Sequence, residues 1–382
     1  MKKLAVIGAS YLQLPLIRRA KQMGIETHVF AWECGDVGET EADYFYPISI
    51  IEKDEILETC IKIGVDGICS IASDLAVLTV CYVAEKMGLV SNGIESSLMS
   101  VNKYAMKRAF EQNNVPAASC KLACPGDYPN VDDMHYPLIV KPTDRSGSRG
   151  VTRIDSADDD IKSAIDRAIE QSLEKKALVE EYVFGEEYSV ECISYEGRHT
   201  LLSVTKKYTT GNPHYIETGH LEPADISADV LEKLERVVFR GLDALKVRYG
   251  ASHTELKING SEIKIIETGA RMGGDMIGST LVNLSTGYDF VKAVIDISLG
   301  QKPDDFKKET PRCAAIRYIL DEDGKNCLDM IKRDYPGILY ESDSEEADLD
   351  KVSDSSSRKG YYIIVSDDKS LVLEFMPDSK TA

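Results

Sequence analysis

Two glutamates near the middle of the chain are placed where a metal ion and a polyphosphate could be held together. Glu255 and Glu267 each lie in a short apolar stretch typical of a β-strand, and Asn259 and Gly260 between them favour a hairpin turn. Carboxylate pairs, with phosphate oxygens and water completing the coordination, commonly hold Mg²⁺ on a nucleotide. The sequence therefore predicts a magnesium site between two strands.

The register of this hairpin decides whether both glutamates face the same side. Side chains alternate along a strand, so a two-residue turn at Asn259 and Gly260 places Glu255 and Glu267 on opposite faces. A three-residue loop that extends through Ser261 makes them diagonal neighbours on one face. Because a shared metal ion requires one face, we expect the longer loop.

An arginine follows the second glutamate at a useful distance. Arg271 lies four residues after Glu267 and is followed by Gly273 and Gly274, which favour a flexible turn. A guanidinium group there could face a transferred phosphoryl group. A simpler interpretation is that Glu255 and Glu267 are exposed residues at the ends of strands. That interpretation does not explain why an arginine and a glycine turn follow Glu267.

A glycine-rich loop upstream could surround phosphates. The apolar run Leu138 to Val140 predicts a strand that ends at Lys141, and Arg145 and Arg149 follow in the loop. Small residues leave backbone N–H groups free to bind phosphate oxygens, although a mobile hairpin loop is the alternative. The loop residues expected at the phosphates are Ser146, Gly147, Ser148 and Gly150.

The glycine turn near the N-terminus is a weaker candidate for a nucleotide-binding site. Gly8 ends a predicted strand, as in a dinucleotide fingerprint, but Ser10 and Gln13 replace the second and third glycines. Their side chains would obstruct a pyrophosphate, so we expect a structural Rossmann-like domain despite Glu33 near the usual ribose position.

The elements that must position these residues change character along the chain. Up to about residue 100, short apolar runs such as Leu4 to Ile7 alternate with helical patterns such as Leu75 to Met87, which predicts a parallel sheet covered on both faces. A helix from about Ser100 to Asn114 follows. Strands Glu187 to Tyr195 and His199 to Tyr208 then alternate apolar and polar residues, which predicts an antiparallel sheet.

Composition excludes several classes of function. The 64 acidic and 45 basic residues give a net charge of −19, which disfavours binding to nucleic acid. No apolar run approaches the length of a membrane span, and Leu4 to Ile7 is too short for a signal peptide. Nine scattered cysteines indicate a reducing compartment. We expect a soluble cytoplasmic protein with no membrane partner.

Together these motifs resemble the ATP-grasp superfamily over residues 1 to about 300. Within it, the stretch Tyr215 to His220 and the stretch Glu267 to Arg271 are similar to L-amino-acid ligases that form dipeptides. The resemblance implies an ATP- and Mg²⁺-dependent, ADP-forming ligase that joins a small-molecule carboxylate to an amine through an acyl phosphate. It also implies two Mg²⁺ ions, with Mn²⁺ as a possible substitute, and a homodimer.

The resemblance assigns roles to individual residues. It implies that Lys103 and Lys141 bind phosphates, that Glu187 accepts the ribose hydroxyls and that Glu255 and Glu267 are the magnesium ligands. The segment against which adenine would lie is Glu180, Glu181, Tyr182 and Val183. The catalytic residues that it implies are Arg271, which would stabilise the acyl phosphate, and Glu217 and His220, which would form the amino-acid pocket.

At one position the sequence departs from the family pattern, and the role of two histidines has more than one interpretation. Gly269 stands where many relatives have an asparagine metal ligand, and the amino-acid-ligase subgroup has the same glycine. His220 and His253 could help to deprotonate the attacking ammonium group. For His253 a structural role is at least an equal alternative.

The implied fold is an ATP-grasp fold that combines α/β and α+β parts. We expect an N-terminal Rossmann-like parallel-sheet domain (1–98), a small antiparallel lid subdomain with a linking helix (99–185) and a larger α+β catalytic subdomain (186–310). C-terminal strands (311–382) would pack on the catalytic subdomain. Within them, the acidic, serine-rich segment Glu341 to Arg358 is predicted to be a solvated loop without assigned function.

Two other functions stay open at this point. A carboxylase or a carbamoyl-phosphate-synthase-like enzyme would keep the fold and use bicarbonate. A catalytically silent nucleotide-binding module would bind ATP without turnover, although both glutamates and Arg271 are retained.

Overall fold

Three β-sheets organise the computed structural model, which describes residues 1–212, 215–307, 312–343, 358 and 360–377. The first sheet has the order β3-β2-β1-β4, and its strand pairs are parallel. Its strands are β1 (Lys3–Ile7), β2 (Glu26–Phe30), β3 (Tyr44–Tyr46) and β4 (Gly67–Cys69). The helices of this region are α1 (Leu14–Gln22), α2 (Val37–Glu41), α3 (Lys53–Ile63) and α4 (Asp74–Met87).

Both faces of this parallel sheet are covered, as the sequence predicts. Leu4 and Val6 on β1 belong to the same apolar cluster as Leu16 of α1. Ala5 and Ile7, which alternate with them, belong to a second cluster that contains residues of α3 and α4. The carboxyl ends of the strands, where open α/β sheets bind ligands, therefore lie between two packed layers.

The second sheet is small and antiparallel, with the order β5-β8-β6-β7. Its strands are β5 (Cys120–Ala123), β6 (Leu138–Pro142), β7 (Thr152–Ile154) and β8 (Ala177–Glu181), and α7 (Ile161–Gln171) packs against it. Two helices, α5 (Ile94–Val101) and α6 (Lys103–Gln112), precede it. The predicted helix from Ser100 thus begins at Lys103, because Asn102 caps α6 by accepting the Ala105 N–H at 2.9 Å.

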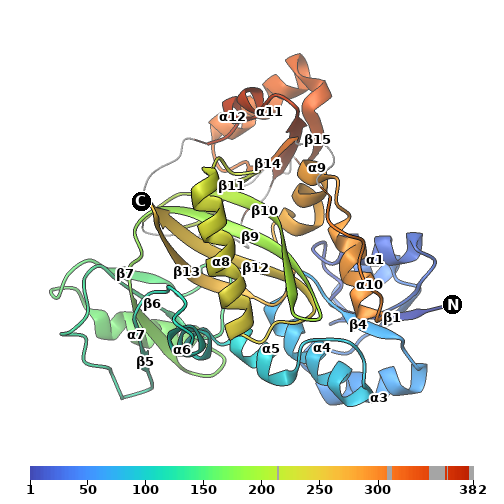
Figure 1. The fold of residues 1–382 in the computed structure, drawn as a ribbon, viewed down its shortest axis with the longest axis horizontal. Coiled ribbons are helices and arrows are strands. Elements are labelled where there is room, and N and C mark those ends of the chain that lie inside the picture. Colours follow the sequence, from blue (N-terminus) through green and yellow to red (C-terminus); the bar gives the residue numbers. More distant parts are fainter. Residues whose placement is uncertain (213–214, 308–311, 344–357, 359, 378–382) are drawn as a thin grey trace.

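The third sheet is antiparallel and has eight strands in the order β13-β12-β9-β10-β11-β14-β16-β15. The first five in sequence are β9 (Glu186–Tyr195), β10 (Arg198–Thr209), β11 (Glu217–Glu222), β12 (Gly250–Asn259) and β13 (Glu262–Gly269). Helix α8 (Ala228–Ala244) crosses one face, where its apolar side packs on β9 and β12 (Figure 1). The predicted antiparallel middle region is confirmed.

Strands from the C-terminal part extend this large sheet. They are β14 (Cys313–Tyr318), β15 (Leu339–Asp343) and β16 (Tyr361–Ser366), with β14 paired to β11. The remaining helical segments are η1 (Ile277–Leu281), α9 (Val282–Thr286), α10 (Phe290–Ser298), α11 (Glu322–Asp334), η2 (Pro336–Ile338) and α12 (Lys369–Glu374). Among the described residues, the helices all fall short of the length and apolar content that crossing a membrane requires.

Helix α10 joins the first and third sheets. Phe290 and Val294 on this helix share an apolar cluster with Leu16 of α1 and with Ile193 and Ala251 of the large sheet. The division at residues 98, 185 and 310 stays a prediction. What matters for the site is that the three sheets meet around one region of the molecule.

Candidate active site

A cavity of about 370 Å³ is lined by residues of the two antiparallel sheets and by residues that follow strands of the parallel sheet, such as Leu12 and Asp74. It gathers nearly every residue that the sequence singles out: Lys103, Lys141, Ser146, Gly147, Ser148, Glu180, Glu181, Tyr182, Val183, Glu187, Glu217, His220, Glu255, Glu267 and Arg271. Gly150 lies instead at the end of the glycine-rich loop, where Pro142 and Gln171 are its neighbours.

Glu255 and Glu267 lie directly opposite each other on neighbouring strands. The predicted three-residue loop is wrong, because Asn259 pairs with Glu262 across a two-residue turn at Gly260 and Ser261. A β-bulge corrects the register instead, since Leu256 pairs with Ile265 whereas Glu255 pairs with Glu267. The extra residue, Ile266, brings both carboxylates to one face.

This carboxylate pair fits a magnesium ion bound together with phosphates. No cluster of three or more His, Cys, Asp or Glu side chains arranged to hold a metal occurs within the described ranges. Mg²⁺ usually takes only one or two carboxylates and completes its octahedron with substrate phosphates and water. Glu255 and Glu267 would hold the ion, and the ion would neutralise charge on the phosphates.

Two lysines and a buried glutamate form the wall beside the glycine-rich loop. Lys103, the first residue of α6, has its Nζ 2.6 Å from Glu267 Oε1. Lys141 forms an ion pair with Glu180, and Lys107 lies 3.2 Å from the other Glu180 oxygen. Burial opposes the charge on Lys141, but Glu180 outweighs it and raises the pKa of Lys141. Lys141 therefore presents a positive charge to the cavity.

The segment predicted to face adenine joins β8 to β9. The Lys257 Nζ lies 4.4 Å from the centre of the Tyr182 ring and donates a hydrogen bond to its hydroxyl at 3.0 Å. Glu181 accepts a hydrogen bond from the backbone N–H of His135 at 2.9 Å. The Glu180 side chain is occupied by Lys107 and Lys141, so it fixes lysines rather than reading a base.

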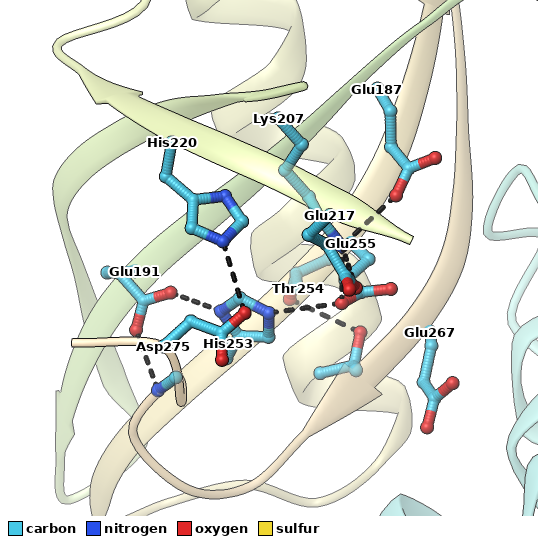
Figure 2. A network of polar contacts seen from close by, with 12 residues as sticks. Glu187, Glu191, Lys207, Glu217, His220, His253, Thr254, Glu255, Glu267 and Asp275 are labelled. Atoms are coloured by element: carbon cyan, nitrogen blue, oxygen red, sulfur yellow. Dashed lines mark hydrogen bonds and ion pairs between the residues drawn. The ribbon is translucent and has the colours of Figure 1, made fainter. Parts of the chain in front are cut away.

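Lys207 on β10 is a site residue that the sequence analysis missed. Its buried Nζ lies 2.9 Å from Glu255, 3.0 Å from Glu187 and 3.7 Å from Glu217 (Figure 2). Burial disfavours the charged form, but the three carboxylates raise its pKa well above the ordinary value. Adjacent strand residues face opposite sides, so the pair Lys206 and Lys207 was a signal that one lysine points inward.

Arg271 is held by a second residue that was missed. Its Nε and Nη2 lie 2.8 and 3.0 Å from the two carboxylate oxygens of Asp74. Burial raises the pKa of Asp74, but Arg271 outweighs that effect and lowers it. This fork-to-fork pair fixes the plane of the guanidinium group.

His253 connects Glu255 to a buried carboxylate, Glu191. Its Nδ1 bonds to Glu191 and its Nε2 lies 3.4 Å from Glu255 (Figure 2). Burial disfavours the imidazolium, but Glu191 and Glu255 raise the pKa of His253 to about 9. A histidine that is protonated at neutral pH is not a base there, so its position supports a role in orienting Glu255.

Glu217, His220, Asp275 and Arg358 form another part of the cavity lining. His220 Nε2 lies 3.2 Å from Asp275 Oδ2, and Arg358 donates to both Asp275 oxygens at 2.7 and 2.8 Å. The segment Glu341 to Arg358 was predicted to be a solvated loop. The prediction is wrong at both described ends of this segment, because residues 341–343 belong to strand β15 and the Arg358 side chain is only 5% exposed. Residues 344–357 lie outside the described part.

A second cavity of about 420 Å³ adjoins the first. It is lined by the carboxyl ends of the parallel strands, including Gly8 and Ser73, and by Arg145 and Arg149 of the glycine-rich loop. Both cavities share Asp74, Lys103 and Glu267 in their linings. Two ligands could therefore meet at these three residues.

Comparison with known proteins supports the fold. The family described as ATP-grasp domain matches residues 134–279. Alanine–anticapsin ligase of Bacillus subtilis is 24% identical over 301 residues, which are 69% of this chain and 62% of that protein. The chain thus corresponds to less than two-thirds of the length of that relative.

Solved structures resemble the chain over almost its whole length. The L-amino acid ligase from Bacillus licheniformis has a TM-score of 0.81 and 22% identity, covering 98% of this chain and 96% of that one. N5-carboxyaminoimidazole synthetase from Staphylococcus aureus, complexed with ADP, has a TM-score of 0.74 and 16% identity, covering 98% and 95%. Residues 134–279 of the chain thus match an ATP-grasp domain, and the solved structures show that the whole chain shares the fold of these enzymes.

Proposed function

We propose that the chain is an ATP- and Mg²⁺-dependent carboxylate–amine ligase that uses an amino acid and releases ADP and phosphate. The observation that carries the proposal is the pairing of Glu255 with Glu267 beside Arg271 and Lys103 in one cavity. Carboxylates for a metal ion, lysines for phosphates and an arginine for a transferred phosphoryl group are the parts that phosphoryl transfer needs.

The first step makes the carboxylate reactive. A substrate carboxylate oxygen attacks the γ-phosphorus of ATP, the bond to the β-phosphate oxygen breaks, and ADP leaves. Lys103 and Lys141 hold phosphate oxygens, and Arg271, fixed by Asp74, stabilises the charge on the acyl phosphate. Glu255 and Glu267 would hold one or two Mg²⁺ ions, with Mn²⁺ as a substitute, and these ions would neutralise charge on the phosphates.

The second step forms the amide. An amine nitrogen attacks the carbonyl carbon, phosphate leaves with its bridging oxygen, and the nitrogen loses a proton. The second cavity would supply an approach for the amine, because it reaches Lys103 and Glu267 between the parallel sheet and the glycine-rich loop. The loop residues Ser146 to Ser148 line the first cavity and would limit hydrolysis by water.

An amino acid is proposed as the carboxylate substrate for two reasons. Glu217 faces the cavity and can accept an ammonium group, with His220 buried beside it. The relatives named above include one ligase for alanine and one for L-amino acids.

The nine cysteines are all free thiols, which supports a cytoplasmic location. A homodimer stays a prediction.

The test is release of phosphate from ATP and Mg²⁺ by purified protein against single amino acids and amino-acid pairs, with mass analysis of products. We expect phosphate release that depends on the presence of two amino acids, together with a product in which the two are joined. Release that requires bicarbonate instead would establish the carboxylase-like alternative. ATP binding without release under any of these conditions would leave a nucleotide-binding module.

A further inference from the structure

Each carboxylate of the metal pair is neutralised by a lysine of the chain. Glu267 Oε1 lies 2.6 Å from the Nζ of Lys103, the first residue of α6. Glu255 Oε1 lies 2.9 Å from the Nζ of Lys207 on β10 (Figure 2). The two lysine side chains are 8% and 4% exposed, so solvent screens these ion pairs only weakly. A metal ion that binds either glutamate therefore competes with an ammonium group.

Lys207 is shared among three carboxylates. Its Nζ also lies 3.0 Å from Glu187 and 3.7 Å from Glu217. Glu217 has a second cationic neighbour, because its Oε2 lies 3.7 Å from Arg358 Nη1. The charge of Lys207 is therefore needed by several carboxylates at once, and Glu255 cannot exchange this partner without affecting the others.

The other charged groups close to the two glutamates include several cations. His253 Nε2 lies 3.4 Å from Glu255. Two further cations interact with Glu267 electrostatically, and each has a carboxylate partner of its own: Lys141 with Glu180, and Arg271 with Asp74. Among the described residues, the lining of the first cavity contains eight Asp and Glu and eight Lys and Arg. It thus has no excess of acidic side chains that would attract a divalent cation by itself.

We propose that Lys103 and Lys207 keep a metal ion from binding Glu255 and Glu267 until the phosphates of a nucleotide replace the two glutamates as their partners. The inference rests on the proposed function and adds an order of assembly to it. The metal ion and the nucleotide bind together, and a free divalent cation does not occupy the site.

Exchange of partners gives the physical reason for this order. If Glu255 turned to a metal ion alone, the buried ammonium group of Lys207 would lose one of its counter-charges, and a buried charge without its partner is strongly unfavourable. Phosphate oxygens remove this penalty, because lysine binds phosphate as a point charge. Each lysine then exchanges a carboxylate for a phosphate, and both glutamates become available to the metal ion.

The direct probe is Mn²⁺ without nucleotide, with the free ion measured by its electron paramagnetic resonance signal. Lys207→Met removes the ammonium group but keeps a long side chain, so Glu255 loses its closest cation. The variant should bind Mn²⁺ at least about tenfold more tightly than the wild type. Lys103→Met should also bind Mn²⁺ more tightly, because it removes the partner of Glu267.

A matched control lies next to Lys207 on the same strand. Lys206 pairs with Glu186 at 2.8 Å and faces the other side of the sheet. Lys206→Met removes the same charge, so its Mn²⁺ affinity reports binding to the rest of the acidic surface and should equal that of the wild type. Adding Glu255→Gln to Lys207→Met should abolish the gain, which locates the bound Mn²⁺ at Glu255.

Calorimetry of ADP binding, with Mn²⁺ and with EDTA, separates this inference from the proposed function. The wild type should bind ADP more tightly with Mn²⁺. If Mn²⁺ makes no difference, the metal pair itself is wrong, and the inference fails with it. If Mn²⁺ does strengthen ADP binding, but the wild type binds Mn²⁺ alone as tightly as Lys207→Met does, the inference alone is overturned. If Lys207→Met does not fold, the same comparison with Lys103→Met decides.

Discussion

Two parts of the first cavity are held together in different ways: the part around Lys141 and Glu180, which the proposed function assigns to the nucleotide (the nucleotide end), and the part around Asp275 and Arg358, which it assigns to the substrate (the substrate end). At the nucleotide end, Lys141 and Glu180 lie on neighbouring strands of the small sheet, and Lys107 comes from the adjoining helix α6. At the substrate end, Asp275 meets Arg358 across 83 residues of chain. The first end is a local construction, whereas the second exists only when the C-terminal part has packed on the large sheet.

This difference predicts which residues and which properties a substitution at each end would affect. A substitution at the nucleotide end should act on the lysines beside it and on the small sheet. A substitution at the substrate end should act on residues that are far away in sequence and should change selectivity before it changes nucleotide binding.

The largest effect is expected at the buried centre of the nucleotide end. Glu180→Gln removes the charge that Lys107 and Lys141 share, and an unpaired buried charge costs about 3–5 kcal/mol of stability. Urea unfolding measures it. Glu181→Gln, on the neighbouring and less buried carboxylate, should cost less than about 1 kcal/mol. Equal costs would show that the lysines do not depend on Glu180.

The next effect concerns the metal pair. Glu267→Gln removes one of the two facing carboxylates and should lower kcat by about 10²–10³-fold while ATP binding persists. The measurement is phosphate release with the best substrate pair, alongside ATP titration. Glu262→Gln, on the same strand and exposed, is the control and should retain full activity. Full activity in Glu267→Gln would contradict the metal-site assignment.

The two ends also differ in how far they could be predicted from the sequence. Lys141, the loop that contains Ser146 and the segment around Tyr182 follow one another along the chain, so their order identifies them. The carboxylate pair was predicted with the wrong turn, because a bulge at Ile266 depends on packing and leaves no mark on the turn residues. The requirement of one face for both glutamates nevertheless held.

Residues that act through long-range pairs could not be found in this way. Asp74 is one acidic residue at a helix start among many possible ones, and only the fold brings it to Arg271. Arg358 follows a serine-rich acidic stretch, whose composition indicates solvent rather than a buried ion pair. The fold class was predictable because strand and helix periods are local, whereas these partners are set by tertiary packing.

A pH-dependent effect is expected beside the substrate end. Glu222 on β11 is fully buried and accepts hydrogen bonds from Thr205 and Ser285 at 2.7 and 3.0 Å. Burial raises the pKa of its carboxyl group from 4.5 to about 7. The folded state then binds the proton more tightly than the unfolded state, so stability falls as pH rises from 4.5 through about 7.

This loss should amount to roughly 3 kcal/mol. Unfolding free energies measured at several pH values in this window test it. Glu222→Gln stays neutral and keeps an acceptor, so the variant should show a flatter profile than the wild type. Identical slopes for the two proteins would mean that Glu222 is ionised in the folded state or does not differ from the unfolded one.

The smallest of these effects joins the two ends, because Asp74 comes from the parallel domain and Arg271 from the turn that continues to Asp275. Asp74→Asn keeps the shape and removes the charge, so Arg271 loses its fixed plane. We expect kcat to fall about 10–100-fold, as when partners that orient catalytic groups are changed, with ATP affinity nearly unchanged.

A matched control separates orientation from stability. Asp66→Asn breaks an exposed pair with Lys2, 2.7 Å apart, at the opposite end of β4 from Asp74, and should leave kcat unchanged. If Asp74→Asn lowers the unfolding free energy but not kcat, the pair between Asp74 and Arg271 only stabilises the packing of the parallel-sheet region on the large sheet. If kcat falls while KM for ATP holds, Asp74 orients Arg271 for the acyl phosphate, and the substrate end depends on a partner that lies 197 residues away in sequence.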